Sequence, residues 1–196
     1  MSKFYKILAV IAVGSMLLLA TTVQMAMAWD RGISLADLAG GFAGGNSGFV
    51  TACTNSGGCS TSSPTLVPLN SVDAIQLTFD EKGNFCATDA NVSAPVAGSN
   101  APASAATIIL NGRTTNFDPV TGQGDFSVKL YAGGSCHGPN FDSTGATQVA
   151  TVTAHFVVSE SGNRIDDVVT TFTSLADDLT ANVTHHTIFR QLRNHD

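Results

Sequence analysis

The chain has 196 residues, 12% of them charged and 43% hydrophobic, and its fifteen acidic and nine basic residues give a net charge of −6 at pH 7. An acidic chain with few, scattered basic residues is poorly suited to binding nucleic acid or an anionic membrane surface. With so few charges, the surface must be made largely of Ser, Thr, Asn and Gly, a composition common in secreted β proteins.

Residues 1–28 have the pattern of a cleaved secretory signal peptide. Two lysines precede an apolar run over residues 7–20, and Ala26 and Ala28 place small residues at −3 and −1 of the expected cleavage site. The run is shorter than the roughly 20 residues that cross a bilayer as a helix, which argues against an uncleaved anchor. We therefore expect export to the periplasm or the extracellular space. The mature chain, 29–196, is expected to form one domain without a membrane-spanning helix.

All four cysteines lie in the expected mature chain, and an even number in an oxidising compartment predicts two disulfides. Cys53 and Cys59 share one Gly/Ser/Thr-rich loop, which favours a bond between them and leaves Cys86 to pair with Cys136. Four cysteines allow three pairings, so the other two stay open. No CxxC is present and the spacing is irregular, so the cysteines give little support for a metal site.

The first half of the mature chain begins with a short helical turn. Ser34 is expected to cap it over residues 35–38, and the glycine-rich segment 40–50 predicts a bent strand. Residues 51–71 are polar and contain prolines, which predicts a loop. Residues 89–105, rich in Ala, Ser, Pro, Gly and Asn, predict another.

Three hairpins follow from period-two alternation of apolar and polar residues, over residues 75–88, 107–131 and 150–174. The pair Asn111-Gly112 predicts a turn in the second hairpin. In the third, Val168, Thr170 and Phe172 are expected on one face. A last strand is expected over residues 182–190. The sequence thus predicts an all-β fold: an antiparallel meander of about eight strands closed into a barrel, with a two-sheet β-sandwich as the alternative.

Three segments repeat an apolar strand, an Asp/Gly turn and a second apolar strand: residues 77–83, 116–124 and 156–162. This pattern resembles the calycin-type barrels, a group that includes lipocalins and allene-oxide-cyclase-like barrels, over roughly residues 38–192. The lipocalin Gly-x-Trp signature is missing, since the only tryptophan, Trp29, precedes the barrel. The resemblance implies a fold with an apolar cavity and implies no activity.

Few residues suggest chemistry. His185 and His186 are neighbours in a strand and point to opposite faces, so a metal site would need one of them together with His155. The acidic pairs Asp166-Asp167 and Asp177-Asp178 are expected to be solvated. No serine-hydrolase elbow, phosphate loop or dinucleotide fingerprint is present. We therefore assign no catalytic residue, metal or cofactor.

Three functions remain: an exported barrel that binds a small apolar ligand, a structural or interaction module of the cell surface or extracellular space, and an enzyme on a barrel scaffold. The binding barrel ranks first, and the enzyme needs a polar cluster inside the barrel that the sequence does not nominate. Nothing in the sequence indicates an oligomeric state. The candidates for a ligand cavity are the inward apolar residues of the hairpin strands: Ile75, Leu77, Phe79, Phe126, Leu130, Val152 and Phe156.

Overall fold

The computed structural model describes residues 32–53, 66–95, 104–175, 180–181, 183–184 and 186–192. Its compact unit comprises Ile33–Asp196. The expected signal peptide, the Cys53–Cys59 pair, Asp177-Asp178 and His185 lie outside the described residues and side chains. Within the described part of the chain, no helix is long and apolar enough to cross a membrane.

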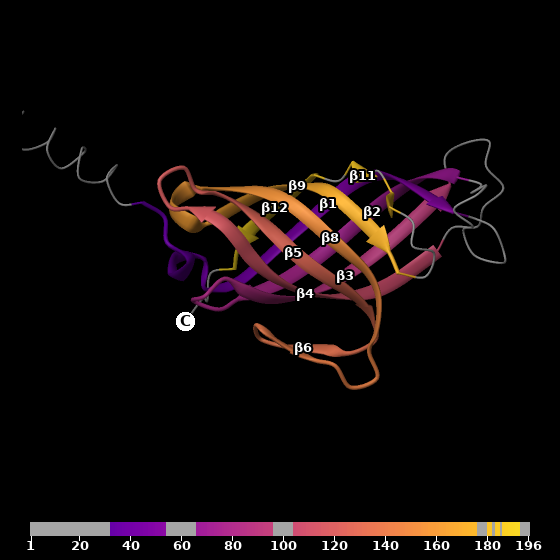
Figure 1. The fold of residues 1–196 in the computed structure, drawn as a ribbon, viewed down its shortest axis with the longest axis horizontal. Coiled ribbons are helices and arrows are strands. Elements are labelled where there is room, and N and C mark those ends of the chain that lie inside the picture. Colours follow the sequence, from indigo (N-terminus) through magenta and orange to yellow (C-terminus); the bar gives the residue numbers. More distant parts are fainter. Residues whose placement is uncertain are drawn as a thin grey trace, which may run out of the picture. The chain divides into compact units, whose positions relative to one another are not determined.

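Eight long strands form an antiparallel barrel closed by hydrogen bonds (Figure 1). Each strand pairs with the next along the chain, the last pairs with the first, and the ring has no free edge. The predicted all-β meander barrel is thus confirmed, and the sandwich alternative is wrong. The barrel strands are β1 (Gly40–Cys53), β2 (Leu66–Phe79), β3 (Asn84–Pro95), β4 (Ser104–Asp118), β5 (Gln123–Ala132), β8 (Thr147–Ser159), β9 (Arg164–Ser174) and β12 (His186–Gln191). Two short strands, β10 (Thr180–Ala181) and β11 (Val183–Thr184), pair with β9 and β1.

The first strands are longer than the sequence predicts. β1 and β2 pair continuously from Gly40 opposite Phe79 to Cys53 opposite Leu66, so the expected loop over 51–71 belongs partly to strands. β3 likewise continues to Pro95. Polar side chains do not interrupt a ladder held by backbone hydrogen bonds, so composition alone misplaces these strand ends.

The turn predicted at Asn111-Gly112 is wrong, because β4 runs straight through it. Gly112 lies directly opposite Phe85 of β3 inside the barrel. A Cβ atom on Gly112 would stand 2.2 Å from Phe85 Cζ, so glycine is required there by the aromatic ring rather than by a turn. The pair of Gly124 and Phe156 repeats this arrangement between β5 and β8.

The inward face of β9 also differs from the prediction. Val168 points outward and is 48% exposed, while Val169 and Phe172 line the interior. The register against β8 shifts here, with Val169 opposite Ala154 and Thr171 opposite Thr153. Thr170 is therefore the extra residue of a β-bulge, which changes the parity of the strand.

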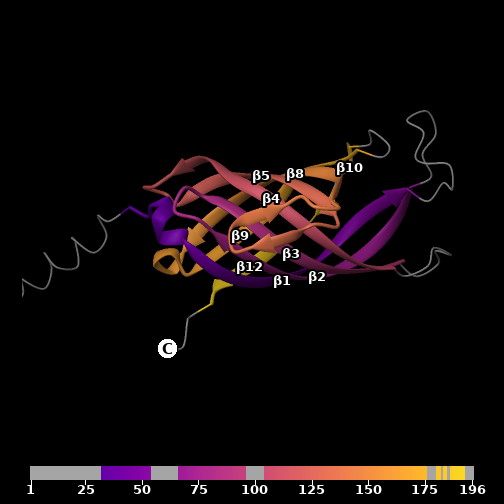
Figure 2. The same cartoon turned by 90° about the horizontal axis from the view of Figure 1, so that it is seen from below.

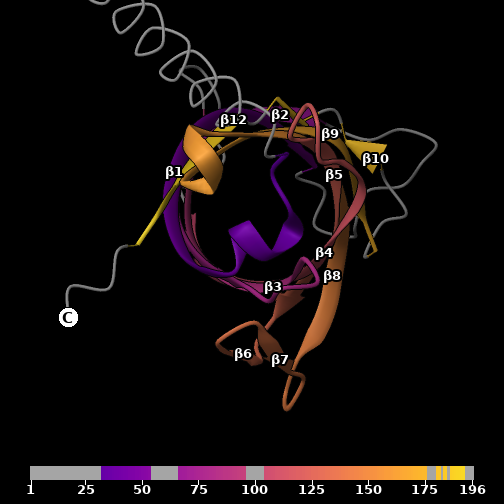
Figure 3. The ribbon, with the colours of Figure 1, turned by 90° about the vertical axis from the view of Figure 1, so that its left-hand side faces the viewer.

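One end of the barrel is filled by aromatic rings and closed by the short 3-10 helix η1 (Leu35–Leu38), which lies inside the ring of strands in Figure 3. Ser34 lies at the N-cap position of η1 as predicted, and Asp37 Oδ2 accepts hydrogen bonds from the backbone N–H and the hydroxyl of Ser34 at 2.7 Å. Leu38 is fully buried against the core. The rings of Phe126 and Phe156 stack with centroids 4.0 Å apart.

A small hairpin, β6 (Ser135–His137) and β7 (Asn140–Asp142), lies on the outer surface of the barrel, as Figure 2 and Figure 3 show. Cys86 points outward from β3 and bonds to Cys136 on β6, with a Cα–Cα distance of 5.6 Å. The predicted Cys86–Cys136 disulfide is thus confirmed. This bond attaches the long connection between β5 and β8 to β3, and it joins two cysteines that are 50 residues apart in the sequence.

Candidate ligand-binding cavity

The half of the barrel beyond the aromatic core encloses a cavity of about 420 Å³. All eight barrel strands contribute side chains to its lining. The volume lies within the roughly 300–1,000 Å³ typical of small-molecule sites. Since η1 and the aromatic rings occupy one end, the cavity extends from Phe126 toward the other end, where β1 and β3 end and β2 and β4 begin.

Three consecutive strands, β4, β5 and β8, form an apolar wall. Inward side chains alternate with outward polar ones along β5 and β8, because every second residue of a strand faces the interior. On β5, for example, Val128 and Leu130 face inward. Ser127 and Lys129 face outward and are exposed. The wall is made of Ile108, Leu110, Val128, Leu130, Ala150 and Val152.

Five of the seven predicted cavity residues line the cavity: Ile75, Leu77, Phe126, Leu130 and Val152. The other two, Phe79 and Phe156, are buried in the aromatic core and are not part of the lining. Phe79 is the last residue of β2, next to the turn at the closed end, so its inward position places it in the filled half of the barrel.

The opposite wall carries all the polar side chains of the described lining, together with some apolar ones. Five inward residues stand directly opposite one another in register across five neighbouring strands, β9, β12, β1, β2 and β3. In that order they are Asp167, Thr187, Asn46, Asp73 and Asn91, and we call this set the polar row. All but the half-buried Asn91 are buried.

Hydrogen bonds run along the polar row. The backbone N–H of Thr187 donates to Asp167 Oδ1 at 3.1 Å, and Asn46 Nδ2 donates to Thr187 Oγ1 at 3.3 Å. Asn91 Nδ2 donates to Asp73 Oδ1. Most of these buried polar groups therefore satisfy one another, as buried polar groups generally must.

Two further polar residues face the cavity, each two positions before a residue of the polar row on the same strand. Ser71 precedes Asp73 on β2, and Asp89 precedes Asn91 on β3. Ser71 on β2 donates to Asp73 Oδ1 at 3.1 Å and accepts from Asn91 Nδ2 at 2.6 Å. Asp89 on β3 differs, because its Oδ1 is buried and accepts no hydrogen bond from any described residue. A buried acceptor without a donor is energetically unfavourable, so Asp89 is the group most in need of a partner.

Burial raises the pKa of Asp89 from 3.8 to about 7, with a contribution from the nearby carboxylate of Asp73. Burial likewise raises the pKa of Asp167 to about 6, although the hydroxyl and backbone N–H of Thr187 act in the opposite direction. Among the described residues, no Lys, Arg or His lines the cavity. Its polar wall is therefore rich in acceptors and becomes anionic as the pH rises.

Part of this wall could have been predicted from the sequence. Ser71 and Asp73 have the same strand parity as Ile75, which was recognised as inward, and Asp89 and Asn91 have the parity of Phe85. Ser71, Asp89 and Asn91 fall in segments predicted as loops, and this prediction concealed the pattern. The expectation that Asp166-Asp167 is solvated is wrong for Asp167, which is 8% exposed, whereas Asp166 binds Arg164 on the outer face.

His155 and His186, two of the histidines considered for a metal site, lie on the outer surface. His155 Nδ1 is 3.1 Å from Asp125 Oδ1, and His186 Nε2 is 3.8 Å from Asp166 Oδ1. Val168 lies between the two histidines in register, so they do not converge. Within the described part of the chain, no group of three or more His, Cys, Asp or Glu side chains is placed to hold a metal ion.

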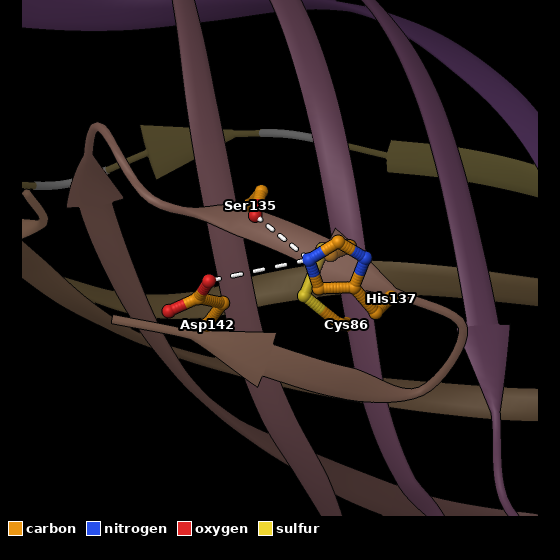
Figure 4. Close-up of a disulfide and its surroundings, with 5 residues drawn as sticks. Cys86, Ser135, His137 and Asp142 are labelled. Carbon is orange, nitrogen blue, oxygen red and sulfur yellow. Dashed lines mark hydrogen bonds and ion pairs between the residues drawn. A yellow bond between two sulfur atoms is a disulfide. The ribbon is translucent and has the colours of Figure 1, made fainter. Parts of the chain in front are cut away.

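The outer hairpin brings Ser135, His137 and Asp142 together beside the disulfide of Cys86 (Figure 4). The Ser135 hydroxyl is 3.4 Å and Asp142 Oδ2 is 4.0 Å from the same atom, His137 Nε2. A hydrolytic triad uses the two ring nitrogens for different partners. Because both partners here approach one nitrogen of a histidine that is 74% exposed, this cluster does not form a triad.

The closed, eight-stranded antiparallel barrel agrees with a calycin-like barrel in general architecture. Comparison of the chain with protein-family models, curated proteins and solved structures finds no match.

Proposed function

We propose that this protein is an exported barrel that binds a small, largely apolar molecule in its central cavity. The observation that carries the proposal is the cavity of about 420 Å³, enclosed by all eight strands beside a core that is otherwise well packed. On this proposal the barrel works as lipocalin-type barrels of eight strands do, with an interior that holds one small ligand.

The energetics of the lining favour an occupant. A cavity of about 420 Å³ has room for several water molecules, each of which occupies about 30 Å³ in the liquid. Waters beside the wall of β4, β5 and β8 find few hydrogen-bond partners there, so a ligand that displaces them gains free energy. The space is of the size that small-molecule sites have.

Export is supported by two features of the chain. Residues 1–28 have the composition of a signal peptide. The Cys86–Cys136 disulfide is of a kind that persists in oxidising compartments and is rare in the cytoplasm. Together they favour a function in the periplasm or the extracellular space.

A fluorescence titration with the neutral apolar probe N-phenyl-1-naphthylamine tests the proposal. Val152→Trp puts a large ring into the cavity, while Val157→Trp puts the same ring on the exposed face of the same strand. Saturable binding by the wild type and Val157→Trp, weakened about tenfold or more in Val152→Trp, is the expected result. Near-UV circular dichroism of each variant establishes that it is folded.

Equal binding by both tryptophan variants would place the probe outside the cavity and contradict the proposal. No saturable binding by the wild type would favour the runner-up, a structural or interaction module without a ligand.

An enzyme is a second candidate because Asp89 lies in the cavity with a pKa of about 7, as suits a general acid or base at neutral pH. It predicts that a bound molecule is chemically altered on incubation with the wild type and not with Asp89→Asn. A binding protein returns the same molecule unchanged.

A further inference from the structure

The two-sided lining specifies more than an apolar ligand. Resting on the proposed function, we infer that the ligand is an amine: its apolar body lies on the wall of β4, β5 and β8, and its ammonium group lies against Asp89 and Asp73.

The polar side chains of the described lining are confined to one side of the barrel. The polar row occupies five consecutive strands of the ring, and the apolar wall occupies the remaining three. A wholly apolar ligand would cover carboxyl and amide groups without bonding to them, and burying an unbonded polar group is unfavourable. The ligand therefore has a polar end as well as an apolar body.

The charges of the cavity lining determine which polar group of a ligand fits there. The cavity lining contains three carboxyl groups, on Asp73, Asp89 and Asp167, and no basic side chain among the described residues. The amide of Asn91 already donates to Ser71 and Asp73. A carboxylate or phosphate end would meet like charge, whereas an ammonium group brings three N–H donors and a compensating charge.

Asp89 offers a buried acceptor to this polar end of the ligand. Its Oδ1 is buried, lines the cavity side of β3 and lacks a hydrogen-bond donor among the described residues. On the neighbouring strands, β2 presents Asp73 and Ile75 to it, and β4 presents Ile108. None of these groups can neutralise the Asp89 carboxylate, so a ligand cation is the partner that its position lacks.

This assignment gives the binding a pH dependence. Because burial and Asp73 hold the pKa of Asp89 near 7, the free protein carries a largely neutral Asp89 at pH 5.5 and a largely ionised one at pH 8. An ammonium group binds the ionised form. Affinity for an amine should therefore rise over this interval, while affinity for a neutral alcohol of the same shape should not.

Three probes with one apolar body test the inference by isothermal titration calorimetry: 1-naphthylmethylamine, 1-naphthylmethanol and 1-naphthoate. At pH 8 we expect the amine to bind about tenfold or more tightly than the alcohol, the scale of one charge-assisted hydrogen bond. We expect the naphthoate to bind most weakly. At pH 5.5 the preference for the amine over the alcohol should shrink.

Asp89→Asn is expected to remove the preference for the amine and to leave the affinity for the alcohol nearly unchanged. Asp125→Asn is the matched control, because it removes one carboxylate from the outer face, away from the cavity, and should leave the wild-type ranking intact. The ranking of the three probes by the wild type does not depend on either variant folding.

Equal binding of amine and alcohol, or tighter binding of naphthoate, would overturn the inference. In both cases binding of the alcohol would leave the proposed function standing. If neither the three probes nor N-phenyl-1-naphthylamine bound the wild type, the proposed function would fail together with the inference.

Discussion

Replacing Asp89 by Asn should stabilise the fold, and increasingly so as the pH rises. The pKa of this carboxyl is about 7 in the folded protein, against 3.8 for an unperturbed group, because it is buried and near Asp73. Below about pH 4 the side chain is neutral in both states. Between about pH 4 and pH 7 the unfolded chain releases the proton and the folded protein keeps it, so the stability of the wild type falls. Above about pH 7 both states are ionised and the trend ends.

The size of the effect follows from the same values. At roughly 1.36 kcal/mol for each pH unit, the difference between 3.8 and about 7 corresponds to about 4 kcal/mol for a group wholly removed from solvent. Asp89 is only partly buried, and water in the cavity screens its charge. We therefore expect Asp89→Asn to gain about 2 kcal/mol relative to the wild type between about pH 5 and pH 8.

Urea unfolding followed by circular dichroism at pH 5, 6, 7 and 8 measures this difference. Asp118→Asn is the control: hydrogen bonds from the backbone N–H of Val120 and the hydroxyl of Thr121 lower the pKa of Asp118, so it is ionised in both states over this range. Its stability relative to the wild type should not change with pH. A difference for Asp89→Asn that stays flat or shrinks as the pH rises would refute the argument that a buried, unpaired carboxylate lies in the cavity.

Two further predictions concern the walls of the barrel. Gly112→Ala places a Cβ atom 2.2 Å from Phe85 Cζ and should lower the melting temperature, because the free energy of unfolding falls by about 2 kcal/mol. Gly41→Ala meets only an ordinary contact at 3.5 Å and should change the melting temperature little. Equal effects of the two substitutions would contradict the inference that the Phe85 ring requires glycine at position 112. Replacing both Cys86 and Cys136 by Ala opens a bond that spans 50 residues and should lower the unfolding free energy by about 2–4 kcal/mol. Because that disulfide lies outside the barrel, affinity for N-phenyl-1-naphthylamine should survive its removal, and a loss of binding would show that the outer hairpin shapes the cavity.

The sequence was most informative where one face of a strand is apolar and the other polar. The alternation around Ile75, Leu77 and Phe79 predicted both the strand and its inward face, and five of the seven nominated cavity residues line the cavity. How deep each residue lies is set by the stagger of the strands around the closed barrel. Local alternation does not contain that information, and Phe79 therefore lies in the core rather than in the lining.

Two local signals were overridden by neighbours distant in the sequence. Asn111-Gly112 has the composition of a hairpin turn, yet Gly112 serves to accommodate the ring of Phe85 on the adjacent strand. Ser71 and Asp89 lie in segments predicted as loops, yet each continues the inward parity of a strand. Polar residues at inward positions violate the usual pattern of a barrel core, and such violations are expected where a protein binds something.

Methyl NMR spectroscopy with 1-naphthylmethanol shows directly whether a ligand binds inside the barrel, because methyl groups mark both of its faces. Intermolecular nuclear Overhauser effects locate the probe on one face or the other. If the ligand binds in the cavity, we expect contacts from the probe to the inward methyl groups of Leu110, Val128, Leu130 and Val152. Contacts confined to the outward methyl groups of Val72, Val157, Val168 and Ile188, or no contacts at saturating probe, would contradict it.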